Sequence, residues 1–279
     1  MAANLDLSTV KLRRHYQDRF DNDPALITRH YSEVRGADFE SLLSGRILAI
    51  RALDFFSPTI AYKAAEQIAV CSELSYYSNA AMIAKVGLAY FETIDGELSK
   101  REYFERAATF QKQVDAFFYP DSSPAERMRA FLDRSWPFGC RVLRNNIGNE
   151  FFYGLLRIFK GSEAITHVDR IEWDDHTINQ PLAQIALNTY IGIPDDGGEL
   201  ALWNFSPSKE FYESAGKAYG IDESLLQRAP DLTIAPSIGE LIVFDSRRLH
   251  AVRKGVGTRI TCSCFALLFD SKGPLYIYS

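Results

Sequence analysis

The pattern of apolar and polar positions divides the 279-residue chain into two parts that meet near residue 140. In the first part, amphipathic segments follow residues that commonly begin helices, and one strand-like run, Arg46–Phe56, interrupts them. Residues 1–140 are therefore predicted to be mainly helical, with Met1–Gly45 as an irregular or helical lead-in. The predicted helix starts are Ser57-Pro58, Ser99 with Glu102 as a capping box, and Ser123-Pro124 with Glu126.

From about Arg141 onward, strand-like runs alternate with turns rich in Gly, Pro and Asp. Short strands with this punctuation are typical of a double-sheet jelly roll. We therefore predict an α+β fold in which residues 141–279 form a cupin-like double-stranded β-helix, with the N-terminal helices packed on one face and a polar insertion at about 206–231. The predicted strands are Phe151–Phe159, Ala164–Asp169, Ala183–Ile191, Glu199–Phe205, Leu232–Ile234, Glu240–Phe244, His250–Val252 and Arg259–Phe269.

Candidate metal ligands stand in two of these strands. His167 and Asp169 are two residues apart, so on an extended strand both side chains point to the same face. His250, from a neighbouring strand, would complete a set of two imidazoles and one carboxylate. This set, with the remaining positions open, suits non-haem Fe(II) and oxygen chemistry.

Arg259 follows His250 by nine residues and is the one basic residue of the last predicted strand. Its guanidinium could hold a carboxylate through two parallel hydrogen bonds. His-x-Asp alone occurs by chance in many chains, whereas its combination with the distal His and Arg is a specific signal. The alternative is that His167 and His250 are structural and that Arg259 is a surface cation.

Composition and charge exclude several classes of function. Nearly half of the residues are hydrophobic and the net charge is −5, so the chain can bury a sizeable core and lacks the concentrated basic surface that nucleic acids require. No run approaches the length of a membrane span, and Met1–Lys11 carries no secretory signal. The four cysteines show no CxxC spacing, which favours reduced thiols in a cytoplasmic protein.

The motifs together resemble those of the Fe(II)/2-oxoglutarate-dependent dioxygenases. The similarity lies in His167-x-Asp169, Gly197–Leu200, Gly239–Leu241 and His250 with Arg259, and it covers roughly residues 150–270. The stretch Leu156–Glu163, the Gly-Gly-Glu-Leu-x-x-x-Asn run and the ending Tyr276–Ser279 resemble the branch of N-acyl amino acid hydroxylases and freestanding indole-alkaloid halogenases. This fainter similarity extends to residues 46–70.

The resemblance implies that His167, Asp169 and His250 hold Fe(II), that 2-oxoglutarate chelates the ion, and that Arg259 binds its distal carboxylate. O2 would be the co-substrate, and succinate and CO2 would be products. In the halogenases of this branch, Gly replaces the motif carboxylate and leaves a position for chloride. Asp169 fills that position here, so the resemblance implies hydroxylation or a related oxidation.

Six further residues are candidates with open alternatives. Thr261, Asn188 and Tyr190 could add hydrogen bonds to 2-oxoglutarate, or could be ordinary strand residues. Arg157 could meet an acidic group of the substrate or co-substrate, or form a structural ion pair. His176 could touch substrate or be a solvated loop residue, and Trp203 could wall the pocket or belong to the core.

Three functions are compatible with these observations. The first is a biosynthetic 2-oxoglutarate-dependent hydroxylase acting on a small amino-acid-like or specialised metabolite. The second is the same cofactor chemistry on a protein side chain or a nucleotide. The third is a jelly-roll binding module without catalysis, although a plain binding pocket needs no such set of His, Asp and Arg. The sequence does not indicate an oligomeric state.

Overall fold

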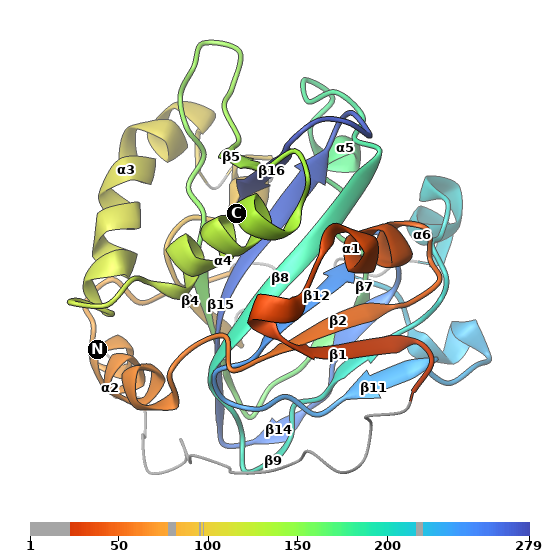
Figure 1. Ribbon diagram of the computed structural model, residues 1–279, viewed down its shortest axis with the longest axis horizontal. Coiled ribbons are helices and arrows are strands. Elements are labelled where there is room, and N and C mark those ends of the chain that lie inside the picture. The colour runs from red at the N-terminus through yellow and green to blue at the C-terminus, as the bar shows by residue number, and fades with distance from the viewer. Residues whose placement is uncertain (1–22, 78–81, 95, 97, 216–219) are drawn as a thin grey trace.

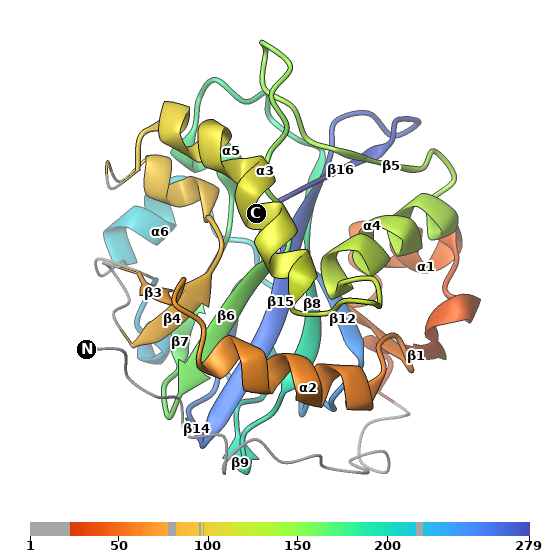
Figure 2. The same cartoon turned by 90° about the vertical axis from the view of Figure 1, so that its left-hand side faces the viewer.

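Two β-sheets face each other, and helices cover the outer face of the larger sheet (Figure 1) (Figure 2). The computed structural model describes residues 23–77, 82–94, 96, 98–215 and 220–279. This arrangement confirms the predicted α+β class with a jelly-roll core.

The strands of the large sheet come from nearly the whole length of the sequence. Its order is β1 (Leu26–His30), β2 (Ala49–Leu53), β12 (Leu241–Asp245), β8 (Ala183–Gly192), β15 (Thr258–Leu268), β6 (Leu155–Lys160), β4 (Ile83–Val86) and β3 (Ser75–Tyr76). Two further strands, β16 (Leu275–Tyr278) and β5 (Cys140–Val142), extend it beside the end of β15.

The small sheet has the order β11 (Leu232–Ile234), β10 (Leu200–Leu202), β13 (His250–Val252) and β7 (Ala164–His167). A separate pair joins β9 (Asp196–Gly197) to β14 (Gly255–Val256). The outer face of the small sheet packs against the segment that the sequence predicts as an insertion. The residues of this segment that make the contacts include Tyr212, Ile221 and Leu226.

Four helices cover the large sheet: α1 (Gly36–Leu43), α2 (Pro58–Ala69), α3 (Lys100–Ala116) and α4 (Pro124–Ser135) (Figure 2). Two short helices belong to the core region, α5 (Ile171–Asp174) directly after β7 and α6 (Lys209–Ala215) in the insertion. The 3-10 turns are η2 (Tyr31–Glu33), η3 (Tyr90–Thr93) and η4 (Glu223–Leu226).

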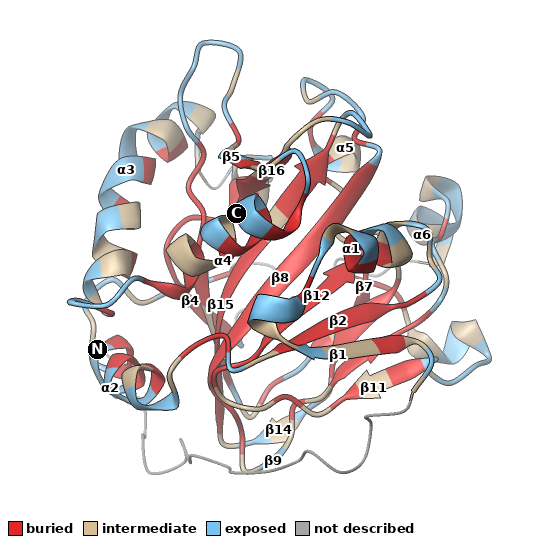
Figure 3. Ribbon diagram, in the orientation of Figure 1, coloured by how far each residue is buried: buried red, intermediate tan, exposed pale blue. Residues whose placement is uncertain are grey.

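Strand alternation separates the two faces of the large sheet. In β15, Ile260, Cys262 and Cys264 pack in the core beneath the helices, while the alternate residues Arg259 and Thr261 point into the space between the sheets. The strands β8, β12 and β15 are buried along nearly their whole length (Figure 3). The polar residues on their inner faces are therefore held inside the molecule, where buried polar groups need partners.

The predicted helix starts agree with the structure in most respects. The hydroxyls of Ser99 and Ser123 accept hydrogen bonds from the backbone N–H groups of Glu102 and Glu126, as capping residues do. Ser57 makes no such hydrogen bond, and α2 begins at Pro58, whose fixed φ suits the first turn.

Four predicted strands are shorter in the structure. The run Arg46–Phe56 is reduced to β2 and the run Glu199–Phe205 to β10. The strand predicted from Phe151 begins only at Leu155, because Gly154 has a φ of +99° and an added Cβ would lie 2.4 Å from the Cβ of Ala125. The strand predicted to end at Asp169 ends at His167, so Asp169 lies in the following loop.

The prediction of helices for residues 1–140 missed the strands β1, β3 and β4, which belong to the large sheet. The division into residues 1–140 and 141–279 stays a prediction, and the part of the lead-in before residue 23, with Met1–Lys11, lies outside the described residues. None of the described helices has the length and apolar character needed to cross a bilayer. The four cysteines form no disulfide.

Candidate metal and co-substrate site

Two histidines lie side by side on adjacent strands of the small sheet. His167 ends β7 and pairs directly with His250, the first residue of β13, in the antiparallel register. Their ring centroids are 4.2 Å apart, and both residues are buried. The pairing explains how residues 83 positions apart in sequence present their imidazoles to one point.

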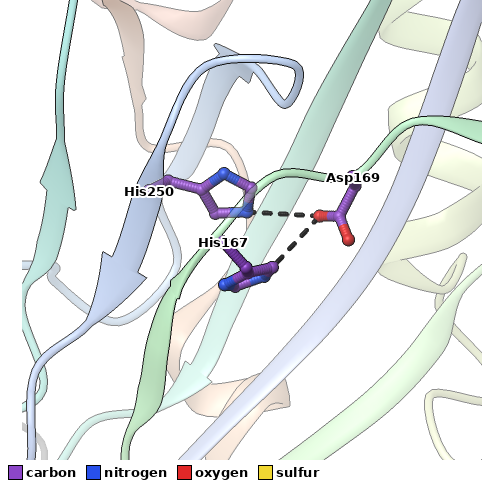
Figure 4. A group of neighbouring side chains, drawn as sticks. All are labelled: His167, Asp169 and His250. Carbon is purple, nitrogen blue, oxygen red and sulfur yellow. Dashed lines mark ion pairs between the residues drawn. The ribbon is translucent and has the colours of Figure 1, made fainter. Parts of the chain in front are cut away.

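The carboxylate of Asp169 completes the group (Figure 4). Its Oδ2 lies 3.2 Å from Nε2 of His250 and 3.8 Å from Nε2 of His167. One ligand atom from each of the three residues lies within 4.8 Å of the other two, close enough for all three to bind one ion. The structure therefore brings together the three residues predicted as metal ligands.

Hydrogen bonds orient both imidazoles. Nδ1 of His167 lies 2.7 Å from the carbonyl oxygen of Ile165, and Nδ1 of His250 lies 3.0 Å from that of Arg248. Because a carbonyl oxygen only accepts, each Nδ1 carries a proton, which leaves each Nε2 as the ring nitrogen that can bind a metal ion on the side of Asp169. Two imidazole nitrogens and a carboxylate oxygen thus face one another, an arrangement that a bound cation stabilises.

The charge states also suit metal binding. Burial, with smaller effects from His250 and Arg157, lowers the pKa of His167 from 6.5 to about 4, so the ring is neutral at neutral pH. Burial raises the pKa of Asp169, but the two imidazoles and Arg157 lower it by more, so that the pKa falls to about 2. Asp169 is therefore ionised. Two neutral nitrogens and one carboxylate oxygen are the donor set that suits Fe(II).

Arg259 is a buried cation with unused hydrogen-bond donors. Its Nη2 donates to the hydroxyl of Tyr190 over 3.4 Å, whereas Nε and Nη1 have no hydrogen-bond partner among the described residues. Its guanidinium stacks at about 5 Å on the rings of Phe159 and Tyr190. A buried cation with free N–H groups is costly unless an anion binds it, so the site suits the distal carboxylate of 2-oxoglutarate.

A cavity of about 310 Å³ between the sheets joins these groups, because His167, Asp169, His250 and Arg259 all line it. Ligand cavities in proteins commonly hold about 300–1,000 Å³, so this one suits small molecules. The aromatic side chains that line it are Tyr77, Tyr90, Phe91, Phe159, Trp173, Tyr212, Phe244, Phe265 and Tyr278.

The other predicted site residues divide into two sets. Thr261 and Asn188 line the cavity, and Tyr190 reaches it through Arg259. Arg157 also lines the cavity; its Nε donates to the hydroxyl of Tyr77 over 3.2 Å, and its guanidinium lies over the ring of Phe265.

His176 and Trp203 do not line the cavity. His176 is exposed in the loop after α5. Trp203 is fully buried in the core cluster on the outer face of the small sheet, where its Nε1 donates to the carbonyl oxygen of Arg228. These positions match the alternatives, a solvated loop residue and a core residue.

The structure adds cavity residues that the sequence analysis missed. Gln184, Ser263 and Phe265 occupy the same strand faces as Asn188 and Arg259, so the two-residue period of β8 and β15 was a signal for them. Tyr77 and Phe91, which stack at 5.4 Å, come from the N-terminal part, and no motif marked them.

Comparisons with known proteins agree with this geometry. The family model described as "carrier-protein-independent halogenase WelO5" matches residues 61–279. An L-gamma-glutamyl-L-propargylglycine hydroxylase from Streptantibioticus cattleyicolor is 28% identical over 208 residues, which cover 71% of this chain and 74% of that protein. Leucinostatins biosynthesis cluster protein S from Purpureocillium lilacinum is 30% identical over 180 residues, covering 61% of this chain and 71% of that protein.

Among solved structures, the fold is similar to that of an N-substituted L-amino acid dioxygenase from Burkholderia ambifaria. That structure gives a TM-score of 0.59 at 18% identity and covers 88% of this chain and 92% of that one. A second structure of the same dioxygenase, in complex with alpha-KG, gives a TM-score of 0.56 at 19% identity, over 88% of this chain and 91% of that one.

Proposed function

The chain belongs to the family of the carrier-protein-independent halogenase WelO5, within the Fe(II)/2-oxoglutarate-dependent dioxygenases, and we propose that it hydroxylates an unactivated C–H bond of a small molecule. Its cofactors are Fe(II) and 2-oxoglutarate, with O2 as co-substrate. Together these supply the oxidative decarboxylation of 2-oxoglutarate to succinate and CO2, coupled to oxidation of the substrate. The protein contributes binding, orientation and exclusion of water.

In this proposal His167, Asp169 and His250 are the metal ligands. The neutral ring of His167 and the ionised carboxylate of Asp169 need lose no proton at neutral pH before they bind the ion. Arg259 would hold the distal carboxylate of 2-oxoglutarate, with Tyr190 fixing one edge of the guanidinium. Thr261 and Asn188, on the same cavity wall, would add hydrogen bonds to the co-substrate.

The proposal of hydroxylation rests on one observation, the carboxylate of Asp169 beside the two imidazoles. A carboxylate ligand fills the position that chloride needs in the halogenases of this family. Asp169 thereby favours hydroxylation over halogenation, although the matching family model is named for a halogenase. A relative that is 28% identical is named a hydroxylase, which supports the same reading.

The substrate that we propose is amino-acid-like or a specialised metabolite. The 310 Å³ cavity has room for small ligands, and its lining combines aromatic rings with the guanidinium of Arg157. The relatives are named for a dipeptide-like substrate and for N-substituted L-amino acids. Arg157 would bind an acidic group of such a substrate. Participation of His176 or Trp203 in substrate binding receives no support from their positions.

The alternatives fit this cavity less well. A protein side chain or a nucleotide would need an open groove near the metal, whereas α5 and α6 contribute Trp173 and Tyr212 to the cavity wall. A binding module without catalysis would not need three ligand groups converging beside a buried arginine whose Nε and Nη1 have no hydrogen-bond partner among the described residues. A cytoplasmic location stays a prediction. These observations do not bear on the oligomeric state.

A product analysis tests the proposal. The protein is incubated with Fe(II), 2-oxoglutarate and 18O2 in chloride-containing buffer, with a panel of N-substituted amino acids and dipeptides, and succinate release identifies substrates. Hydroxylation predicts substrate-dependent succinate and a product that gains one 18O atom. A chlorinated product as the main species would contradict the proposal, and substrate-independent succinate alone would contradict the substrate class.

A further inference from the structure

Asp169 lies beyond the end of β7, so the β-sheet ladder does not hold it. Its carboxylate lies 3.8 Å from Nε2 of His167 and 3.2 Å from Nε2 of His250, and no other side chain among the described residues forms a hydrogen bond or ion pair with it. In metal sites, a ligating carboxylate is usually oriented by a hydrogen bond from a neighbouring residue. Here the orientation must come from elsewhere.

The backbone of Asp169 is held instead. Its N–H donates to the carbonyl oxygen of Ser246 over 2.9 Å. Its carbonyl oxygen accepts from Nε2 of Gln184 over 2.9 Å and from the hydroxyl of Ser246 over 3.2 Å. Both peptide groups of Asp169 are therefore fixed by residues outside its own loop.

Gln184 also holds the far side of this loop. Its Oε1 accepts a hydrogen bond from the N–H of Ile171 over 3.1 Å, two residues after Asp169. The single amide thus bridges the carbonyl of Asp169 and the N–H of Ile171, the first residue of α5. Gln184 is 1% exposed and lies near the start of β8, so a rigid central strand supports the bridge.

Ser246 connects the same loop to the strand that carries the other histidine. It follows β12 directly, and its N–H donates to the carbonyl oxygen of Gln184 over 3.1 Å. His250 lies four residues further on, at the start of β13. Gln184 and Ser246 therefore couple the position of Asp169 to that of His250.

We propose that Gln184 is a positioning residue of the metal site, which directs the carboxylate of Asp169 toward His167 and His250 by holding the backbone on both sides of Asp169. The inference rests on the proposed function, because it requires Asp169 to be a metal ligand. Ser246 assists as the second donor to the same carbonyl oxygen.

The test is the affinity for Co(II), measured by visible absorption titration of the full chain under argon without 2-oxoglutarate. Gln184→Met has nearly the same size and removes both hydrogen bonds to the loop. We expect its dissociation constant for Co(II) to rise about 10- to 100-fold, the usual effect of losing a partner that orients a metal ligand. Ser246→Ala, which keeps the Gln184 bridge, should show a smaller rise.

The matched control is Gln111→Met. Gln111 also accepts a hydrogen bond from a backbone N–H, that of Tyr153 at 3.2 Å, but it lies on α3 and does not line the cavity. This variant should bind Co(II) as the wild-type protein does. Circular dichroism melting of every variant ensures that the titrations compare folded proteins. Should Gln184→Met not fold, Gln184→Asn withdraws the amide by one methylene and serves the same titration.

The outcomes separate the two claims. Wild-type affinity in the folded Gln184 variants, together with lost binding in His167→Ala and Asp169→Ala, would overturn the positioning role and leave the proposed function standing. Unchanged binding in His167→Ala and Asp169→Ala would overturn the proposed function itself. Weakened binding in Gln111→Met equal to that in Gln184→Met would also overturn the inference, because the loss would then report general destabilisation.

Discussion

Arg259 donates a hydrogen bond from Nη2 to the hydroxyl oxygen of Tyr190 over 3.4 Å, and its Nε and Nη1 have no partner among the described residues. A buried guanidinium with two free donors is destabilising on its own. The rings of Phe159 and Tyr190 offset part of this cost by stacking on it. The remaining deficit is what a bound carboxylate would remove.

Replacing Arg259 with Met should therefore separate stability from co-substrate binding. We expect the ligand-free variant to be at least as stable as the wild-type protein, because a poorly paired buried charge is removed. Loss of one partner of a buried ion pair costs about 2–5 kcal/mol, so the affinity for 2-oxoglutarate should fall roughly 30-fold or more. The measurement is the rise in melting temperature that 2-oxoglutarate produces with Fe(II) under argon.

Arg253→Met is the control for this variant. Arg253 also stacks on an aromatic ring, that of Trp203, but it pairs with Glu223 outside the main cavity. Its replacement should leave the 2-oxoglutarate-induced rise unchanged. A full rise in Arg259→Met would remove Arg259 from the co-substrate site.

Replacing Arg157 should weaken the binding of the substrate and not that of 2-oxoglutarate, the reverse of the effect expected for Arg259. Arg157 lines the cavity beside Tyr77 and Phe265, at the wall where we place the substrate. With a substrate identified by succinate release, Arg157→Met should raise the KM for that substrate while the KM for 2-oxoglutarate stays the same. The free energy of substrate binding should become less favourable by about 2 kcal/mol or more if the group that Arg157 recognises is a buried carboxylate. A larger change in the KM for 2-oxoglutarate would assign Arg157 to the co-substrate instead.

The role of Asp169 as a metal ligand can be tested by removing its carboxylate. Asp169→Gly should abolish hydroxylation, because one ligand is lost, and should allow weak chlorination when chloride is present. The hydrogen bonds from the side chains of Gln184 and Ser246 hold the backbone carbonyl of residue 169, so the loop should stay in place when the side chain is removed. The products are compared by mass spectrometry in chloride and chloride-free buffers. Hydroxylation at the wild-type rate would mean that Asp169 is not a ligand.

Asp175 joins the N-terminal part to the loop after the metal site. Its buried carboxylate accepts hydrogen bonds from Tyr90 at 2.6 Å, from Lys100 at 2.7 Å and from the hydroxyl of Thr177 at 2.7 Å. Burial raises the pKa of Asp175, but the hydrogen bonds from Lys100, Tyr90 and Thr177 outweigh it and hold that pKa well below its usual range.

A depressed pKa in the folded state makes the stabilisation depend on pH. The contribution of Asp175 is complete above its unfolded pKa of about 3.9 and is lost as the pH falls through the lower folded value. At pH 7, Asp175→Asn should lower the free energy of unfolding by about 1.5–3 kcal/mol, the usual worth of hydrogen bonds to a charged group. Below about pH 4 the gap to the wild-type protein should narrow.

Urea unfolding at several pH values measures this difference. The exposed Asp121 supplies the control, and Asp121→Asn should leave the free energy of unfolding nearly unchanged at every pH. A gap that stayed constant from pH 7 to pH 3 would show that the ionised form of Asp175 is not what stabilises the fold.

The positions of His250 and Arg259 in the fold could be predicted because the sequence shows the strands that carry them. His250 begins a predicted strand and Arg259 lies in another, and the structure has both strands, β13 and β15, within one residue of the predicted limits. The alternation of apolar and polar positions in β15 also placed Arg259 and Thr261 on one face. Local pattern and fold agree here, so a short motif was sufficient.

Asp169 shows where the same argument fails. The two-residue period placed it beside His167 on an extended strand, but the strand ends at His167. The carboxylate reaches the imidazoles because Gln184 and Ser246 hold its backbone from 15 and 77 residues away. Such long-range side-chain contacts leave no periodic signal in a single sequence.

Several of the strands that the sequence analysis missed have a related explanation, although β4, β5 and β16 were missed as well. β3, β9 and β14 contain only two residues each, too few to show any alternation. β1 owes its place to parallel pairing with β2, which depends on the fold between them. The wall formed by Tyr77 and Phe91 follows from the same distant packing, so it too lay beyond prediction.

The most direct test of the account is an anaerobic titration of the protein with Fe(II) in the presence of 2-oxoglutarate, followed by visible absorption. If His167, Asp169 and His250 hold the ion, the charge-transfer band of the Fe(II)–2-oxoglutarate chelate should appear and saturate at one Fe(II) per chain. It should be absent from His167→Ala and His250→Ala. A band of wild-type intensity in either variant, or none in the wild-type protein, would contradict the assignment of the metal site.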